Sequence, residues 1–268
     1  MNKLLFLILA IPLAQSCSTN AVTGRKQLQL FPESTLQAQA VSQYQSFLSE
    51  NKVVSQNTSR DADMVRRVGG RIASAITSYY KTRQNPVDLS GYKWEFNLVE
   101  NKDVNAWCMP GGKVVVYSGL LPVTQNEAAL AVVLAHEITH AIAQHGNERM
   151  SQVAIAQGLQ VAGNIFTQNK GQANSIFNNV FGPAASVGVL LPNSRKQEYE
   201  ADRFGLIFTA MAGYNPREAI PFWERMAAAG DGNKPPTLLS SHPADQDRIA
   251  QLQKYMPEAL KYYKPIRK

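Results

Sequence analysis

The sequence predicts an α+β fold that is mostly helical and contains one small β-sheet. Most of the 268 residues fall in stretches with helical periodicity or helix-capping signals, separated by loops rich in Gly, Pro, Asn and Asp. Alternation typical of strands is concentrated in one region, residues 92–117. After an N-terminal leader about 250 residues remain, which is enough for one large core and favours a single folded domain.

The chain opens with the features of a signal peptide over residues 1–16. Lys3 precedes an apolar run that is too short to span a bilayer, and small residues lead up to Cys17. The residues before Cys17 resemble a relaxed bacterial lipobox, which implies cleavage before Cys17 and lipidation of that cysteine. We therefore expect residues 17–32 to tether a domain at residues 33–268 to a bacterial membrane, on the periplasmic face of the outer membrane. The alternative is simple secretion, with Cys17 incidental.

Helices are predicted on both sides of the strand region. Residues 33–49 and 61–80 form two of them, and residues 215–229 and 243–256 form two more near the C-terminus. The segment at residues 147–192 is rich in Gly, Ala, Gln and Asn. Its small residues permit close packing, so we expect a helical hairpin on the core; a mobile cover over a neighbouring cleft is the alternative.

Two strands are expected in the strand region. Residues 92–99 alternate as a half-buried strand should, and a Gly-Gly pair leads into a second strand at residues 113–117. Cys108, which lies between them, is interpreted as a small buried hydrophobe. It has no expected disulfide partner, because the other cysteine is the lipid-bearing Cys17.

The most informative stretch is His136-Glu137-Ile138-Thr139-His140. A capping box at residues 124–127 and the apolar run after it predict a buried helix that continues until Gly146. Positions i and i+4 share one helix face, so both imidazoles can reach one Zn²⁺ while Glu137 reaches a water on the metal. Zinc lowers the pKa of such a water and the glutamate takes its proton, which is metallopeptidase chemistry. As ordinary core histidines, the two imidazoles would need other partners on a dry helix.

A third ligand is expected from a second helix, at residues 195–211. Its Glu-x-x-x-Asp pair places two carboxylates on one face, so Glu198 can bind the metal while Asp202 accepts a hydrogen bond from a ligand histidine. Glu200 points elsewhere, and a solvated charged face is its simplest interpretation. His145 does not have the spacing of a third histidine ligand and is expected in the last turn of the first helix.

Together these motifs resemble metallopeptidase family forty-eight, which includes the HtpX membrane peptidases, the CAAX prenyl proteases and a soluble bacterial lipoprotein branch. A further family motif, His-Pro-x-x-x-x-Arg, runs from His242 to Arg248. The order of the motifs matches over essentially the whole mature chain.

The resemblance implies a zincin-like metallopeptidase domain with one Zn²⁺ per chain. The implied ligands are His136, His140 and Glu198, with Glu137 as general base and Asp202 as the residue that orients a ligand.

The same resemblance brings His242 near the metal and lets Arg248 hold the site or the oxyanion. A neutral His242 imidazole at the open metal position would act as a gate. The alternative is a plain helix cap before Pro243.

The resemblance also places residues 104–110 at the edge of the sheet, over the cleft. An edge strand pairs with an extended peptide through main-chain hydrogen bonds, so Asn105 and Ala106 are candidate substrate contacts. Trp107 and Met109 have the alternative of being core residues only.

The predicted function is that of a zinc metalloendopeptidase of the bacterial cell envelope. It would cut unfolded or extended polypeptides in protein quality control, with a membrane as partner through its N-terminal lipid. The net charge of +7 is spread along the chain without a basic cluster, so no nucleic-acid partner is expected. A catalytically silent chaperone or assembly factor and a zinc exopeptidase or oligopeptidase are the alternatives.

Overall fold

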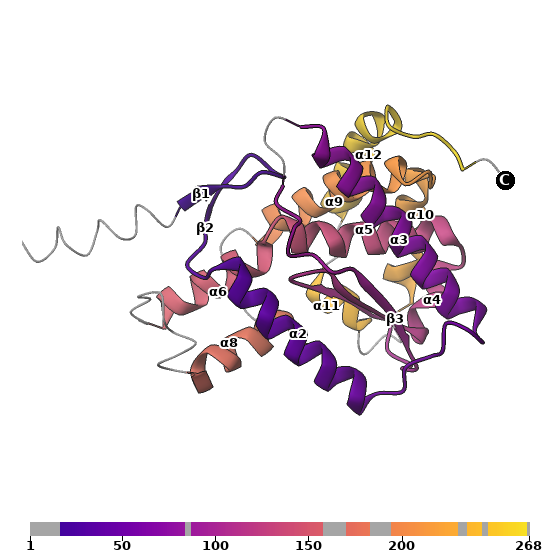
Figure 1. The fold of residues 1–268 in the computed structure, drawn as a ribbon. Coiled ribbons are helices and arrows are strands. Elements are labelled where there is room, and N and C mark those ends of the chain that lie inside the picture. Colours follow the sequence, from indigo (N-terminus) through magenta and orange to yellow (C-terminus); the bar gives the residue numbers. More distant parts are fainter. Residues whose placement is uncertain are drawn as a thin grey trace, which may run out of the picture.

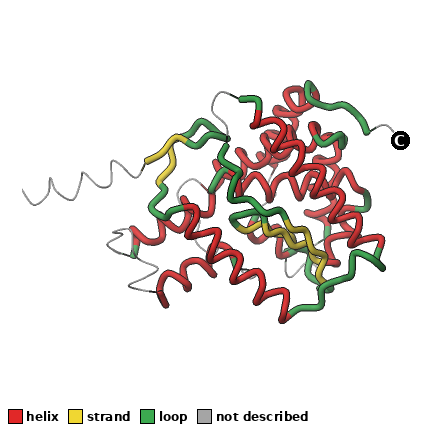
Figure 2. The backbone as a smooth tube through the Cα atoms, viewed as in Figure 1, coloured by secondary structure: helices red, strands yellow, loops and turns green. Residues whose placement is uncertain are grey.

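The computed structural model describes residues 17–83, 87–157, 170–182, 194–229, 235–242 and 246–266. This part of the chain is mostly helical with a small sheet, which confirms the predicted fold class (Figure 1, Figure 2). Its longer helices are α2 (Glu33–Glu50), α3 (Arg60–Lys81), α5 (Glu127–Ile142), α6 (His145–Ala156), α8 (Lys170–Phe181), α9 (Ser194–Met211), α10 (Ala219–Ala228) and α12 (Gln246–Leu260). The short helical turns are η1 (Ser118–Leu120), α4 (Leu121–Thr124), η2 (Pro216–Glu218) and α11 (Thr237–Ser241). The strands are β1 (Cys17–Thr19), β2 (Lys26–Leu28), β3 (Glu95–Val99), β4 (Ala106–Met109) and β5 (Lys113–Tyr117).

Some sequence predictions fall on residues outside this part of the chain. They are the signal peptide at residues 1–16, residues 158–169 and 183–192 of the segment at residues 147–192, and Pro243. Among the described residues, no helix is both long and apolar enough to span a membrane.

A three-stranded sheet separates two hydrophobic cores. Its order is β3–β5–β4, with β5 parallel to β3 and antiparallel to β4, so β4 is an edge strand. Val114 and Val116 of β5 belong to the core formed with α3 and α5, whereas Val115 and Tyr117 belong to the core formed with α2, α6 and α8. Burial on both faces explains why β5 is apolar nearly throughout.

Helix α5 lies at the centre of the first core. All of its residues from Ala129 to Ile142 are buried, and α3, α9 and β4 pack against it (Figure 1). Gly205 of α9 faces the α5 backbone, and a Cβ at this position would lie 3.2 Å from the Cα of His136. The missing side chain lets the two helices approach closely at the level of His136.

The ends of α5 differ from the prediction. The N-cap is Asn126, whose side chain accepts a hydrogen bond from the Ala129 N–H, so the capping box that began at Thr124 is wrong. The helix also ends at Ile142, before Gly146. The chain reverses at Gln144, which adopts the left-handed conformation (φ 53°) that the prediction reserved for a glycine.

The other helices agree with the prediction to within a few residues at most of their ends. Helix α12 is longer than expected and passes through Pro257, because Met256 and Ala259 are both buried in the core. Helices α6 and α8 pack against each other, as in the expected helical hairpin. The linking residues 158–169 lie outside the described residues.

Candidate metal centre

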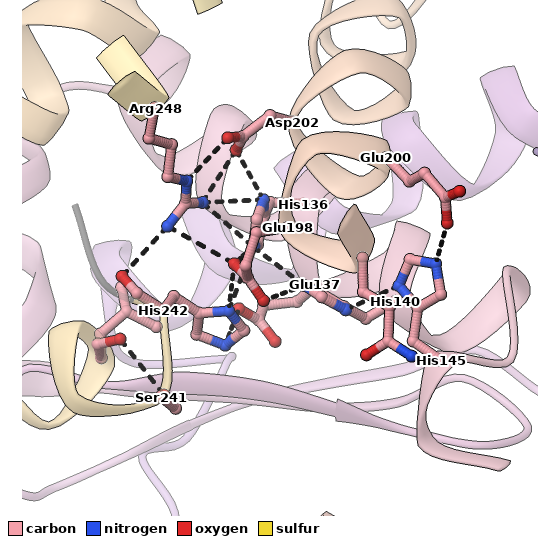
Figure 3. A network of polar contacts seen from close by, with 12 residues as sticks. His136, Glu137, His140, His145, Glu198, Glu200, Asp202, Ser241, His242 and Arg248 are labelled. Carbon is pink, nitrogen blue, oxygen red and sulfur yellow. Dashed lines mark hydrogen bonds and ion pairs between the residues drawn. The ribbon is translucent and has the colours of Figure 1, made fainter. Parts of the chain in front are cut away.

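Two histidines of α5 belong to a buried cluster of polar side chains (Figure 3). His136 and His140 are 3 % and 5 % exposed, and their Nε2 atoms lie 3.1 Å apart. The i, i+4 spacing on one helix explains this convergence.

Helix α9 supplies two carboxylates to the same cluster. Oxygens of Glu198 lie 3.3 Å from the Nε2 atoms of both His136 and His140. Asp202, one turn later, has Oδ1 3.1 Å from Nδ1 of His136, on the far side of that ring. The structure thus brings together the four residues that the sequence assigned to the ligand set and its support.

His242 follows α11 and completes the cluster. Its Nδ1 lies 3.3 Å from Nε2 of His136 and 2.9 Å from Oε2 of Glu198. One ligand atom from each of His136, His140, Glu198 and His242 lies within 4.8 Å of the other three. Bonds of about 2.0–2.2 Å in a tetrahedral zinc site place neighbouring ligand atoms roughly 3.3–3.6 Å apart. The donor set and the observed separations therefore fit a zinc ion, with His242 at the fourth corner.

Burial and charge set the protonation of these ligands. Burial lowers the pKa of His140 well below its usual value, which leaves a neutral imidazole with a free lone pair. Burial raises the pKa of Glu198, but His242 and His140 outweigh it and hold the pKa of this carboxyl well below its usual range. For His136, burial is outweighed by Asp202 and Glu198, which raise its pKa to about 9. The carboxylates of Glu198 and Asp202 therefore favour a positive charge between the ligands. A divalent metal ion carries more of that charge than a single proton on His136.

Glu137 faces the cleft beside the cluster. Its Oε1 is buried, has no hydrogen-bond partner, and lies 3.4 Å from Nε2 of His242. The cleft is lined by Glu137, His140 and His242 on one side and by Asn105 and Ala106 at the start of β4 on the other. A carboxylate oxygen without a partner is well placed to accept a proton from a bound water.

Arg248 lies behind the ligands and does not line the cleft. It is 2 % exposed, and its guanidinium stacks 4.1 Å from the ring centroid of Trp223. Its Nε and Nη2 donate to the two oxygens of Asp202 at 2.7 and 2.8 Å, and its Nη1 donates to the His242 carbonyl at 3.0 Å. Of the two roles considered for Arg248, this position supports holding the site.

Two details of the interpretation from the sequence are wrong: His145 does not lie in the last turn of α5, and Glu200 does not lie on a solvated face. Neither residue is among the four clustered ligand residues. His145 begins α6, because α5 ends early, and its Nδ1 lies 2.9 Å from Nδ1 of His140. Its Nε2 lies 3.1 Å from Glu200, which also accepts hydrogen bonds from Arg25 at 2.7 and 3.1 Å. Glu200 is thus an ion-paired member of a chain that ends on a candidate ligand (Figure 3).

The edge strand also differs in detail from the prediction. Asn105 is buried, and its side-chain oxygen accepts a hydrogen bond from the Ala106 N–H at 3.0 Å. Trp107 and Met109 lie in the second core. Cys108 is only half-buried and lines the cleft, because alternation along β4 turns it away from that core.

Two residues of this region carried no signal in the sequence. Nothing in the sequence pairs Arg25 with Glu148, which is 123 positions away along the chain. Arg149 lines the cleft, although an arginine in the middle of a helix gives no indication of that.

One family and several relatives match the chain. The model of peptidase family M48 matches residues 71–256. The mitochondrial metalloendopeptidase OMA1 of Schizosaccharomyces pombe is 36% identical over 172 residues, which cover 64% of this chain and 49% of that protein. Human metalloendopeptidase OMA1 is 26% identical over 257 residues, which cover 90% of this chain and 46% of that protein. A beta-barrel assembly-enhancing protease of Yersinia pestis is 32% identical over 184 residues, which cover 65% of this chain and 38% of that protein. The chain therefore spans about half the length of these relatives or less.

Proposed function

Because the chain belongs to peptidase family M48 and is a metalloprotease, we propose that it is a zinc-dependent endopeptidase that cuts extended polypeptide segments. The observation that carries this proposal is the partnerless Glu137 Oε1 beside four converging ligand atoms. A binding module without turnover has no use for such a base, which argues against a silent chaperone.

His136, His140 and Glu198 would hold the zinc, which when bound polarises a substrate carbonyl and acidifies a water. Glu137 takes the proton of that water and delivers it to the leaving amine. Asp202 accepts a hydrogen bond from His136 Nδ1 and so fixes the ring with Nε2 toward the metal.

The substrate is proposed to bind along β4. In the described part of the chain, β4 pairs only with β5, so its outer edge is available to an extended peptide. Asn105 and Ala106 lie where this edge meets the cleft and would contact the substrate. Main-chain pairing of this kind suits unfolded or extended segments, because it needs no particular side chain.

We also propose a location in the bacterial cell envelope, with a signal peptide at residues 1–16 and a lipid on Cys17. Relatives named as beta-barrel assembly-enhancing proteases, in Yersinia pestis and Vibrio cholerae, support a role in envelope protein quality control for this chain. Membrane fractionation tests the anchor. Wild type is expected with the membranes, and Cys17→Ser is expected as a soluble protein or an unprocessed precursor. A soluble wild-type protein with a free amino terminus would favour simple secretion.

Glu137→Gln tests the proposed chemistry. This variant should lose cleavage of denatured casein while retaining about one zinc per chain, because Glu137 touches the water and not the metal. Glu198→Ala is the matched control, since it should lose both zinc and cleavage. Loss of zinc from Glu137→Gln would place Glu137 among the ligands and overturn the assignment. Mapping the fragment ends separates internal cleavage from trimming at chain ends.

A further inference from the structure

Arg149 is a charged residue of the cleft that the proposed chemistry does not use. It lies on α6, one turn after His145, and lines the cleft together with Glu137 and His140. Among the residues that the structure describes, its guanidinium makes no hydrogen bond or ion pair. An arginine carries five donors and stays protonated at any physiological pH, so these donors face the cleft without an acceptor.

Two of the three acidic residues whose charges act on Arg149 are engaged elsewhere. Glu148 accepts hydrogen bonds from Arg25 at 2.6 and 2.7 Å and from Gln197 at 2.7 Å. Glu198 belongs to the metal cluster. Burial lowers the pKa of Arg149, although the charges of Glu198, Glu137 and Glu148 act in the opposite direction. The guanidinium is therefore a partly desolvated cation whose neighbours do not neutralise it by direct contact.

Apolar residues also line the same cleft. Val180, Phe181 and Gly182, at the end of α8, line it. Phe181 packs directly on Gly146 of α6, where an added Cβ would lie 2.0 Å from the ring. A group that enters the cleft therefore meets aliphatic and aromatic carbon as well as the guanidinium, which suits a short carbon chain that ends in an anion.

We propose that Arg149 binds a carboxylate of the substrate beside the scissile bond and thereby determines specificity. The proposal rests on the peptidase function above. Guanidinium and carboxylate form paired, charge-assisted hydrogen bonds. A substrate carboxylate would therefore supply the acceptors that the Arg149 guanidinium lacks and offset the cost of its desolvation. The carboxylate has two sources, the side chain of Asp or Glu in an internal segment or the free C-terminus of a chain. The first makes the enzyme an endopeptidase that prefers acidic segments, and the second favours cleavage near chain ends.

Matched peptides distinguish these sources. A reference peptide carries Gln near the scissile bond and an amidated C-terminus; a second replaces Gln by Glu, and a third leaves the C-terminus free. The wild-type enzyme should prefer one of the two carboxylate peptides over the reference by about 10- to 100-fold in kcat/KM. Arg149→Gln should bring that ratio close to one. Arg149→Glu should reverse the charge preference, so that a further peptide with Lys in place of Gln is cleaved faster than the Glu peptide. Arg66→Gln, an exposed arginine of α3 paired with Asp63, is the control and should keep the wild-type ratio.

Binding provides a readout independent of turnover. In the Glu137→Gln background, fluorescence anisotropy with the same peptides, now labelled, should rank their affinities in the same order as their kcat/KM values. Adding Arg149→Gln should abolish the differences in affinity. If Arg149→Gln weakens the binding of all peptides equally, Arg149 acts in main-chain binding or in folding, and the proposal is overturned. A wild-type kcat/KM ratio of one between the carboxylate and reference peptides would also overturn it. If no peptide is cleaved but the order of affinities persists, the peptidase function fails while the carboxylate site stands.

Discussion

Removal of the His242 imidazole is expected to raise basal proteolysis. A catalytic zinc needs an open fourth position for water, and Nδ1 of His242 lies at the corner that the other three ligands leave. The Nε2 of the same ring lies 3.4 Å from Oε1 of Glu137. With a metal bound, the His242 side chain would occupy the water position, and it already contacts the base that would activate the water. We therefore expect the enzyme to rest in an inhibited state.

The structure indicates how strongly this gate is held. To swing out, the His242 ring must give up its hydrogen bond with Oε2 of Glu198 at 2.9 Å and its contact with Oε1 of Glu137 at 3.4 Å. Two such interactions contribute about 0.5–1.5 kcal/mol each, or roughly 1–3 kcal/mol together. That free energy corresponds to a closed population about 5- to 150-fold larger than the open one. His242→Ala should therefore increase kcat/KM by a factor in this range.

The assay compares casein cleavage by wild type and His242→Ala at equal zinc content. Three protein ligands remain in the variant, so zinc should be retained when the metal is in excess. A loss of about 10²–10³ in turnover would refute the gate and indicate that His242 stabilises the transition state. Unchanged activity would return His242 to the role of a helix cap.

Three other substitutions test the support of the site. Asp202→Ala should weaken zinc binding by about 10- to 100-fold, because it removes the acceptor that orients the His136 ring; competition with a fluorescent chelator measures this, and an unchanged affinity would contradict it. Glu200→Gln should also weaken zinc binding, but by less than about tenfold, because one further residue separates Glu200 from the ligand His140; a loss as large as that of Asp202→Ala would show that the distance along the chain of contacts does not matter. Gly205→Ala should destabilise the fold by roughly 1–3 kcal/mol, because its methyl group would crowd the His136 backbone; thermal unfolding measures it, and an unchanged Tm would mean that α9 shifts freely.

The ligand cluster could be predicted because local geometry determines most of it. His136 and His140 share a helix face through their spacing alone, and so do Glu198 and Asp202. Helix α5 is apolar nearly all round and is stable only inside a core, where α9 packs against it. His242 was within reach only through the family resemblance, since nothing in its local sequence directs it toward the metal.

The residues that escaped prediction depend on long-range packing or on an unusual backbone. Gln144 takes a left-handed conformation that sequence rules assign to Gly or Asn, and this moves His145 from the end of one helix to the start of the next. Glu200 then finds a histidine and an arginine that are 55 and 175 positions away. An i+2 position on a helix suggests a solvent-facing side chain, and only the folded neighbours decide otherwise.

The N-terminal segment is where packing changes the functional interpretation most. Residues 17–32 were expected to act as a tether, yet Asn20 donates to the carbonyl of Ala143 at the end of α5, and Val22 and Phe31 are buried. Cys17 itself lies in β1 and pairs with Leu28 of β2, and only two residues separate it from Asn20. If Cys17 carries a lipid, residues 17–32 provide no long flexible linker between that lipid and the domain.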